Sequence, residues 1–148
     1  MLKNIDPLLN ADLLWVLAAM GHGDDLALVD ANHPADTVAS HCIVKKPLRV
    51  SAATMADVAR AILTVFPLDD FTVNPVRRME VVGAPAEVPP IQREVQSVVD
   101  AVHGRALPMM GIERYAFYEA AKQAFAVVQV SDARPYGCFL FRKGVIAA

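Results

Sequence analysis

No run of apolar residues in this 148-residue sequence approaches the roughly 18 that a membrane-spanning helix needs. The first residues also lack the apolar stretch of a secretory signal peptide, since Asp6 soon follows Lys3. Only two cysteines are present, Cys42 and Cys138, and neither forms a CxxC motif or a zinc-ligand spacing with a histidine. These absences predict no membrane segment, no metal site and two free thiols in a cytoplasmic protein.

Charge of one sign is equally scarce. The formal net charge is -2, and basic residues occur in pairs such as Lys45-Lys46 rather than in a stripe, so we expect no nucleic-acid partner. Apolar residues make up 55% of the chain, slightly above the share of an average soluble domain, which suggests surface that subunit contacts cover. No repeat, low-complexity tract or linker interrupts the sequence, so residues 1–148 are expected to form a single domain.

Helix-like and strand-like apolar patterns alternate along the chain. Asn10 and Thr54 are suited to helix N-caps, Pro90 to a helix start, and Gly21 and Gly104 to positions just past helix ends. The expected helices cover residues 11–20, 55–66, 90–103 and 115–124, and the expected strands cover 25–30, 48–52, 76–82, 109–112, 125–130 and 138–141. This alternation predicts an α/β fold, a three-layer sandwich with helices on both faces of a mostly parallel sheet.

His22 stands between Gly21 and Gly23, where an expected helix gives way to an expected strand. Glycine lets backbone approach a ligand closely, and imidazole is the side chain whose ordinary pKa is nearest neutrality. The arrangement predicts a small acid/base site. Two other interpretations remain open: a histidine at the negative end of a helix dipole, or part of a phosphate-binding loop, although such loops normally follow a strand.

Asp30 ends the first expected strand, and is either a ligand-binding carboxylate or the first residue of a turn that continues to Pro34. Ligands of open α/β sheets gather at the carboxyl ends of strands. His22 falls at the start of this strand and Asp30 at its end. Neighbouring strands or a second subunit must therefore bring the two side chains together.

Three more residues have both a structural and a functional interpretation. Arg114 begins an expected helix, an end that favours anions, so its cation requires a carboxylate, a ligand or solvent. Tyr118 has a helical spacing typical of core packing. Tyr136 lies in the turn before the last strand, either as a packing ring or as a hydroxyl that faces a ligand.

Five motifs are distributed over essentially the whole chain, in this order: Met20-Gly21-His22-Gly23-Asp24, Asp30-Ala31-Asn32-x-Pro34-Ala35, Arg114-Tyr115-Ala116-Phe117-Tyr118-Glu119, Tyr136-Gly137 and Arg142-Lys143-Gly144-Val145. Together they resemble the L-fucose mutarotase/D-ribose pyranase family (FucU/RbsD). The resemblance implies an isomerase without metal or cofactor that interconverts the anomers of a monosaccharide such as L-fucose, with or without pyranose–furanose exchange. It also implies a homodecamer of two stacked pentameric rings, with each active site at a subunit boundary.

By position, the resemblance assigns the catalytic role to His22. It assigns sugar binding to Asp30, Arg114, Tyr118, Tyr136, Gly137 and Cys138. It further implies that the last three reach the site from a neighbouring subunit, and the arginine at position 114 favours the fucose branch over the ribose branch.

Two positions depart from the family pattern. Cys138 stands where the family usually has asparagine, and His33 stands where an apolar aromatic residue is common. The first departure removes an amide that would bind sugar. It supports the alternative of a non-catalytic monosaccharide-binding or sugar-transport accessory protein of the same fold, and the sequence does not fix the sugar.

Overall fold

The computed structural model describes residues 2–51 and 53–146. Its strands form one six-stranded sheet in the order β2-β5-β1-β6-β3-β4. The strands are β1 (Asp25–Val29), β2 (Leu48–Val50), β3 (Val76–Met79), β4 (Met110–Ile112), β5 (Ala126–Val130) and β6 (Phe139–Arg142). The helices are α1 (Ala11–Ala19), α2 (Ala35–Ala39), α3 (Met55–Leu63), α4 (Pro90–His103) and α5 (Arg114–Lys122). The expected alternation of helices and strands is thus confirmed.

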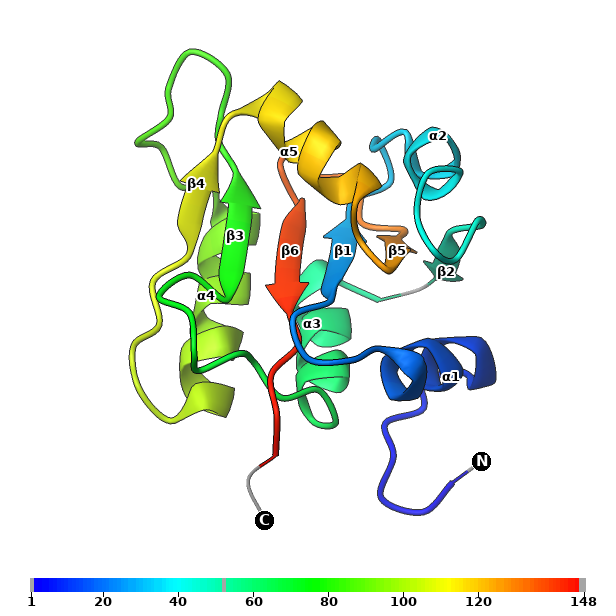
Figure 1. Ribbon diagram of the computed structural model, residues 1–148. Helices are drawn as coiled ribbons and strands as arrows, with labels where there is room; N and C mark the ends of the chain where they lie inside the picture. Colours follow the sequence, from blue (N-terminus) through cyan, green and yellow to red (C-terminus); the bar gives the residue numbers. More distant parts are fainter. Residues whose placement is uncertain (1, 52, 147–148) are drawn as a thin grey trace.

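Among the described strands, all but β6 run in the same direction (Figure 1). β6 lies between β1 and β3 and is antiparallel to both. Residues 131–138 connect β5 to β6, and a parallel return would need a crossover of about a dozen residues or more. The mostly parallel sheet is therefore confirmed, with an antiparallel strand near its centre.

Helices cover both faces of this sheet. Along β1, Leu26 and Leu28 belong to one apolar cluster while Ala27 and Val29 belong to the other, as the alternation of side chains in a strand requires. The first cluster packs against α1, α3 and α4, and the second against α2 and α5 (Figure 1). The three-layer arrangement follows directly from this division.

The predicted caps form. The Asn10 side chain accepts a hydrogen bond from the Leu13 N–H at 2.9 Å, and Thr54 makes a reciprocal capping box with Asp57. Gly104 ends α4 with a φ of 78°, the left-handed backbone that glycine adopts at little cost.

Other local predictions are wrong. Gly21 lies just past the end of α1, as predicted, but it does not adopt the left-handed conformation usual there: Met20 is extended, and Gly23 has the positive φ, 86°. The sequence pattern also does not predict α2, because Pro34 suggests a break, yet proline is tolerated where a helix begins. The predicted strand 76–82 stops at Met79, and the predicted end of strand 48–52, Ala52, lies outside the described residues.

No helix in the described part of the chain has the length and apolar character to span a bilayer.

Candidate functional site

A cavity of about 180 Å³ opens at the edge of the sheet where β1 and β3 end and β6 begins. It is lined by Asp30, Asn32, His33, Met79, Arg114, Tyr118, Pro135, Tyr136 and Cys138. Because β6 is antiparallel, its first residues meet the carboxyl ends of the parallel strands, where ligands of such sheets bind. The volume is below the roughly 300–1,000 Å³ of pockets for drug-sized ligands, and it suits a molecule as small as a monosaccharide.

Asp30 is the most highly connected side chain of this pocket, and it is only 3% exposed. One carboxylate oxygen accepts the Asn32 N–H at 2.9 Å, and the other accepts the Gly137 N–H at 3.0 Å and lies 3.5 Å from the Cys138 Sγ. Burial raises the pKa of Asp30, and the hydrogen bonds oppose that shift only in part. The two backbone N–H groups, one on each oxygen, hold the carboxylate in one orientation.

The backbone of residues 136–137 is packed closely against Asp30. A Cβ at Gly137 would lie 2.6 Å from the Ile91 Cδ1 and 3.3 Å from the Asp30 Cβ, so any other residue here would push the Ile91 side chain aside. Tyr136 has a left-handed φ of 65°. The buried Gln92 holds it there by donating a hydrogen bond from Nε2 to the Tyr136 carbonyl at 2.9 Å.

On the opposite wall, Arg114 and Tyr118 face each other one helical turn apart on α5. The Arg114 Nε donates to the Tyr118 hydroxyl oxygen at 3.1 Å, and the guanidinium lies 5.6 Å from the ring centroid. The hydroxyl oxygen is thus an acceptor in this contact, which leaves its own proton for a ligand oxygen.

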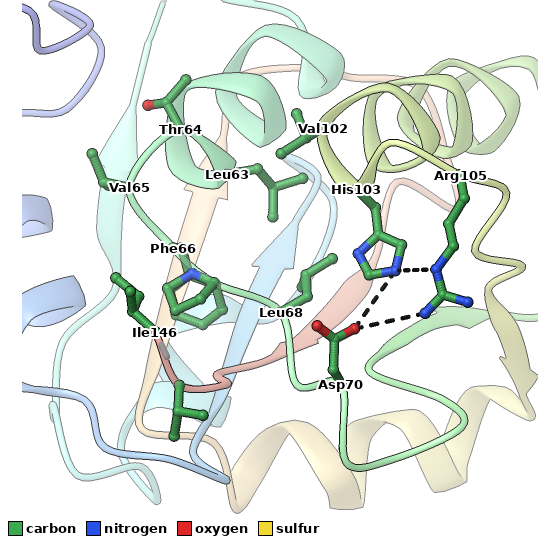
Figure 2. Close-up of a pocket in the computed structure, with 12 residues that line it drawn as sticks. Leu63, Thr64, Val65, Phe66, Leu68, Asp70, Val102, His103, Arg105 and Ile146 are labelled. Carbon is green, nitrogen blue, oxygen red and sulfur yellow. Dashed lines mark hydrogen bonds and ion pairs between the residues drawn. The ribbon is translucent and has the colours of Figure 1, made fainter. Parts of the chain in front are cut away.

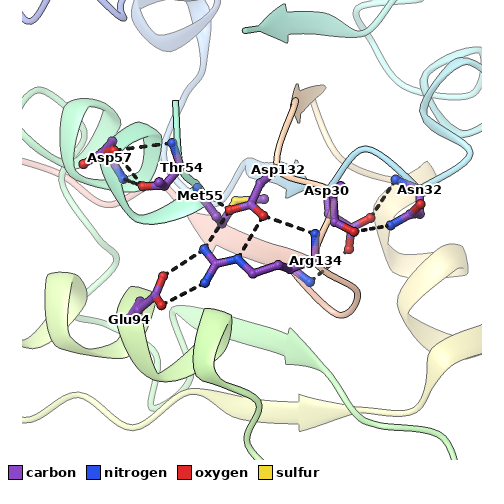
Figure 3. A network of polar contacts seen from close by, with 10 residues as sticks. Asp30, Asn32, Thr54, Met55, Asp57, Glu94, Asp132 and Arg134 are labelled. Carbon is purple, nitrogen blue, oxygen red and sulfur yellow. Dashed lines mark hydrogen bonds and ion pairs between the residues drawn. The ribbon is translucent and has the colours of Figure 1, made fainter. Parts of the chain in front are cut away.

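Figure 3 shows the polar network that anchors the loop before β6. Arg134 lies between Glu94 of α4 and Asp132, at 2.8 Å from an oxygen of each. Its guanidinium lowers the pKa of Asp132 to about 2. The Asn32 side-chain amide also donates to the Ala133 carbonyl at 3.0 Å, which fastens this loop to the segment that follows Asp30.

His22 lies in the turn before β1, at the other edge of the sheet. The five residues of β1 span about 17 Å at about 3.3 Å per residue, so His22 and Asp30 of one chain do not meet. The His22 Nε2 lies 3.1 Å from the Asp69 Oδ1, and its ring centroid lies 5.5 Å from that of Phe71. Asp69 is buried while the His22 side chain is 47% exposed, so the imidazole contacts a buried carboxylate and still has surface that a ligand can reach.

This contact also determines which nitrogen of His22 can react. A carboxylate only accepts hydrogen bonds, so Nε2 carries a proton in the contact with Asp69. Nδ1 is left to accept a proton from a ligand, as in other histidines that a carboxylate orients.

The structure therefore brings together part of the predicted site. Asp30, Arg114, Tyr118, Tyr136 and Cys138 line one pocket, and Gly137 adjoins it through its bond to Asp30. Residues 136–138 share this pocket with Asp30 within one chain, because β6 lies beside β1. That they reach His22 from a neighbouring subunit stays a prediction. His22, the predicted catalytic residue, does not line this pocket in the same chain.

Sequence reasoning missed Asp69 and Gln92. Asp69 is an acidic residue directly after an apolar one, the same signal that identified Asp30, but it lies outside any predicted strand. Gln92 has no sequence signal, because its role depends on a contact between α4 and the loop before β6.

A larger cavity, of about 510 Å³, lies beside the ends of α3 and α4 (Figure 2). Its charged groups pair with one another: His103 lies 3.6 Å from Asp70 and 3.2 Å from Arg105. None of the predicted site residues lines it. The smaller pocket holds Asp30, Arg114, Tyr118, Tyr136 and Cys138 at the carboxyl ends of the strands, so it is the candidate site.

Both cysteines are free, as predicted, and both are buried. Within residues 2–51 and 53–146, no group of three or more His, Cys, Asp or Glu side chains is placed to hold a metal ion.

A three-layer α/β domain with a small polar pocket at the carboxyl ends of its strands defines the class of this protein. Residues 3–146 match the RbsD / FucU transport protein family, and the chain belongs to that family.

Similar proteins extend over the whole chain. The L-fucose mutarotase of Actinobacillus pleuropneumoniae is 35% identical over 145 residues, which cover 98% of this chain and 97% of the relative. The crystal structure of protein Atu2016 has a TM-score of 0.97 at 53% identity and covers 99% of this chain and 97% of its own. The structure of the Streptococcus pneumoniae fucose mutarotase in complex with L-fucose has a TM-score of 0.87 at 29% identity, with coverage of 99% and 100%.

Proposed function

We propose that this chain is a monosaccharide mutarotase of the L-fucose type, an isomerase that interconverts the α and β anomers of a reducing sugar. The observation that carries the proposal is the pocket itself. It joins the carboxylate of Asp30 to Arg114, Tyr118 and Tyr136 in a cavity of monosaccharide size. The 35% identical relative is named L-fucose mutarotase, and the neighbour from Streptococcus pneumoniae holds L-fucose.

Mutarotation requires two proton transfers and no change of oxidation state. A base removes the proton of the anomeric hydroxyl while an acid protonates the ring oxygen, so that the C1–O5 bond breaks and C1 becomes an aldehyde. After rotation about C1–C2, the O5 hydroxyl adds to the other face and the protons return. Positioned acid and base groups typically accelerate such steps by about 10²–10⁴-fold.

In this scheme His22 carries the proton through Nδ1, with Nε2 hydrogen-bonded to Asp69. Asp30 accepts hydrogen bonds from sugar hydroxyls, because both its oxygens retain lone pairs beside their backbone donors. Arg114 and the hydroxyl proton of Tyr118 bind sugar oxygens from the opposite wall.

The site needs a second copy of the chain, since His22 lies at one edge of the sheet and the pocket at the other. Exposed aromatic residues flank both halves: Phe71, 77% exposed, packs on His22, and Tyr115, 68% exposed, packs on Tyr118. Contact between two different edges is heterologous, and such contacts form a ring where the rotation between subunits closes. This supports a homo-oligomer built from rings, and we propose a decamer of two pentamers.

Anomer exchange measured by NMR tests the activity. The protein should accelerate exchange of L-fucose or a related sugar such as D-ribose, and His22→Ala should abolish most of that acceleration. His41→Ala, which changes an exposed histidine outside the site, is the matched control. Acceleration of no sugar would disprove the enzyme, and full activity of His22→Ala would disprove this mechanism.

Mixing two inactive variants tests whether the site is shared. In mixed oligomers of His22→Ala and Asp30→Asn subunits, about a quarter of the sites should combine intact His22 from one chain with intact Asp30 from another. Activity should then return on mixing. No return in proven mixed oligomers, or a strict monomer by light scattering, would contradict the shared site.

A non-catalytic monosaccharide-binding protein is the second candidate function. The observation that favours it is that one chain forms the pocket without His22, and that Cys138 offers a thiol to a ligand there. Calorimetric sugar binding without faster anomer exchange would establish this function instead.

We also propose a cytoplasmic location. Its support is that Cys42 and Cys138 are both unpaired thiols, as is usual in a reducing compartment. Cell fractionation with an antibody to the chain tests it, and recovery outside the cytoplasm would contradict it.

A further inference from the structure

His33 is a buried imidazole in the wall of the pocket. It lies three residues after Asp30, is only 6% exposed and lines the cavity. Its ring packs edge-on against Tyr118, with centroids 5.3 Å apart, and against Phe117, with centroids 6.0 Å apart. Packing therefore places the ring next to a residue that the proposed mechanism puts on the sugar.

The two ring nitrogens have different surroundings. Nδ1 lies 3.7 Å from the Cys138 Sγ, which itself lies 3.5 Å from an Asp30 oxygen. Nε2 is buried and has no hydrogen-bond partner among the described residues. A buried polar atom without a partner costs free energy, so this nitrogen is expected to gain a partner when the protein acts.

The ring is also uncharged. Burial lowers the pKa of His33 to about 4, so that the neutral imidazole predominates near pH 7. A neutral ring nitrogen either donates or accepts one hydrogen bond, depending on the tautomer, and a hydroxyl group can serve either. The chemistry suits an uncharged sugar hydroxyl rather than a carboxylate or phosphate.

We propose that His33 is a specificity-determining residue whose imidazole hydrogen-bonds one hydroxyl of the sugar in this pocket. The inference rests on the proposed function and adds a contact to it. Because Nε2 is covered by protein in this conformation, the ring turns about its Cβ–Cγ bond to reach the sugar. That rotation gives up the long contact with the Cys138 thiol and alters the edge-on contacts with Tyr118 and Phe117.

Calorimetry with L-fucose and three variants at this position provides the test. His33→Phe keeps an aromatic ring without nitrogen and should weaken binding on the order of two- to tenfold. His33→Gln places an amide near the position of Nε2 and should restore most of the affinity, whereas His33→Asn, whose amide reaches only the position of Nδ1, should not. Thermal unfolding of each variant checks that the fold is kept.

A panel of monodeoxy analogues of L-fucose identifies the hydroxyl. Removal of the contacted hydroxyl should weaken binding to the wild-type protein but not to His33→Phe, while removal of any other should weaken both equally. Equal affinities of wild type and His33→Phe, or the same loss in both proteins for every analogue, would overturn the proposal.

The ring itself offers a readout that is independent of catalysis. The ¹⁵N signals of His33 should shift on addition of L-fucose as a ring nitrogen gains a hydrogen bond. If sugar binds and these signals move while anomer exchange is not accelerated, the mutarotase proposal fails and the role of His33 stands. If exchange is accelerated and the signals do not move, the role of His33 fails alone, and absence of any sugar binding overturns both.

Discussion

Replacement of Asp30 by asparagine changes one atom type in the pocket and should affect both stability and sugar binding. The carboxylate accepts the Asn32 N–H at 2.9 Å with one oxygen and the Gly137 N–H at 3.0 Å with the other. An amide has only one oxygen, so in either orientation its NH₂ group faces one of these N–H groups. That buried donor loses its acceptor, at a cost of about 1–3 kcal/mol.

For a chain of this length, each kcal/mol lowers the melting temperature by about 2–4 °C, so Asp30→Asn should melt roughly 2–12 °C below the wild type. Hydrogen bonds to a charged group contribute about 1.5–3 kcal/mol, so the affinity for L-fucose should fall on the order of ten- to a hundredfold. Calorimetry and thermal unfolding at one fixed protein concentration measure the two effects.

Asp36→Asn is the matched control, because its carboxylate is 75% exposed in a surface ion pair with Arg49. It should change stability by less than about 0.5 kcal/mol. If Asp30→Asn were as stable as this control and bound sugar like the wild type, the assignment of Asp30 as the central acceptor of the pocket would be refuted.

Three further predictions concern the loop before β6. The pKa of Asp132, about 2, lies below its ordinary 3.8, so ionised Asp132 stabilises the folded state by about 2 kcal/mol. This stabilisation is present above about pH 4 and is lost as the pH falls through 2. Urea unfolding at about pH 6 and pH 2 should show this loss in the wild type and not in Asp132→Asn. Gly137→Ala should cost about 1–3 kcal/mol of unfolding free energy, and Ile91→Val, which removes the clashing methyl group, should make the double variant more stable than the sum of the single effects predicts. Gln92→Leu leaves the Tyr136 carbonyl without its donor and should lower both the melting temperature and the sugar affinity; an unchanged melting temperature would contradict this role.

Much of the fold could be predicted from local pattern. Asn10 and Thr54 cap their helices as predicted, because capping depends on side chains within three residues along the chain. The short helix α2 could not be predicted, since Pro34 permits both a break and a helix start. Most of its stability comes from packing of Val38 and Ala39 in the cluster beneath α5, which no local pattern encodes.

The sequence by itself determined the strands, the two-faced sheet and the helices other than α2, since periodicity and capping act over a few neighbouring residues. The polar residues of the pocket were identified through the resemblance to the family. Only the tertiary structure decided that β6 runs antiparallel beside β1, which places Tyr136 and Cys138 against Asp30 within one chain. The physical reason is that strand order and direction depend on contacts between segments that can lie more than a hundred residues apart, for which the local sequence carries no signal.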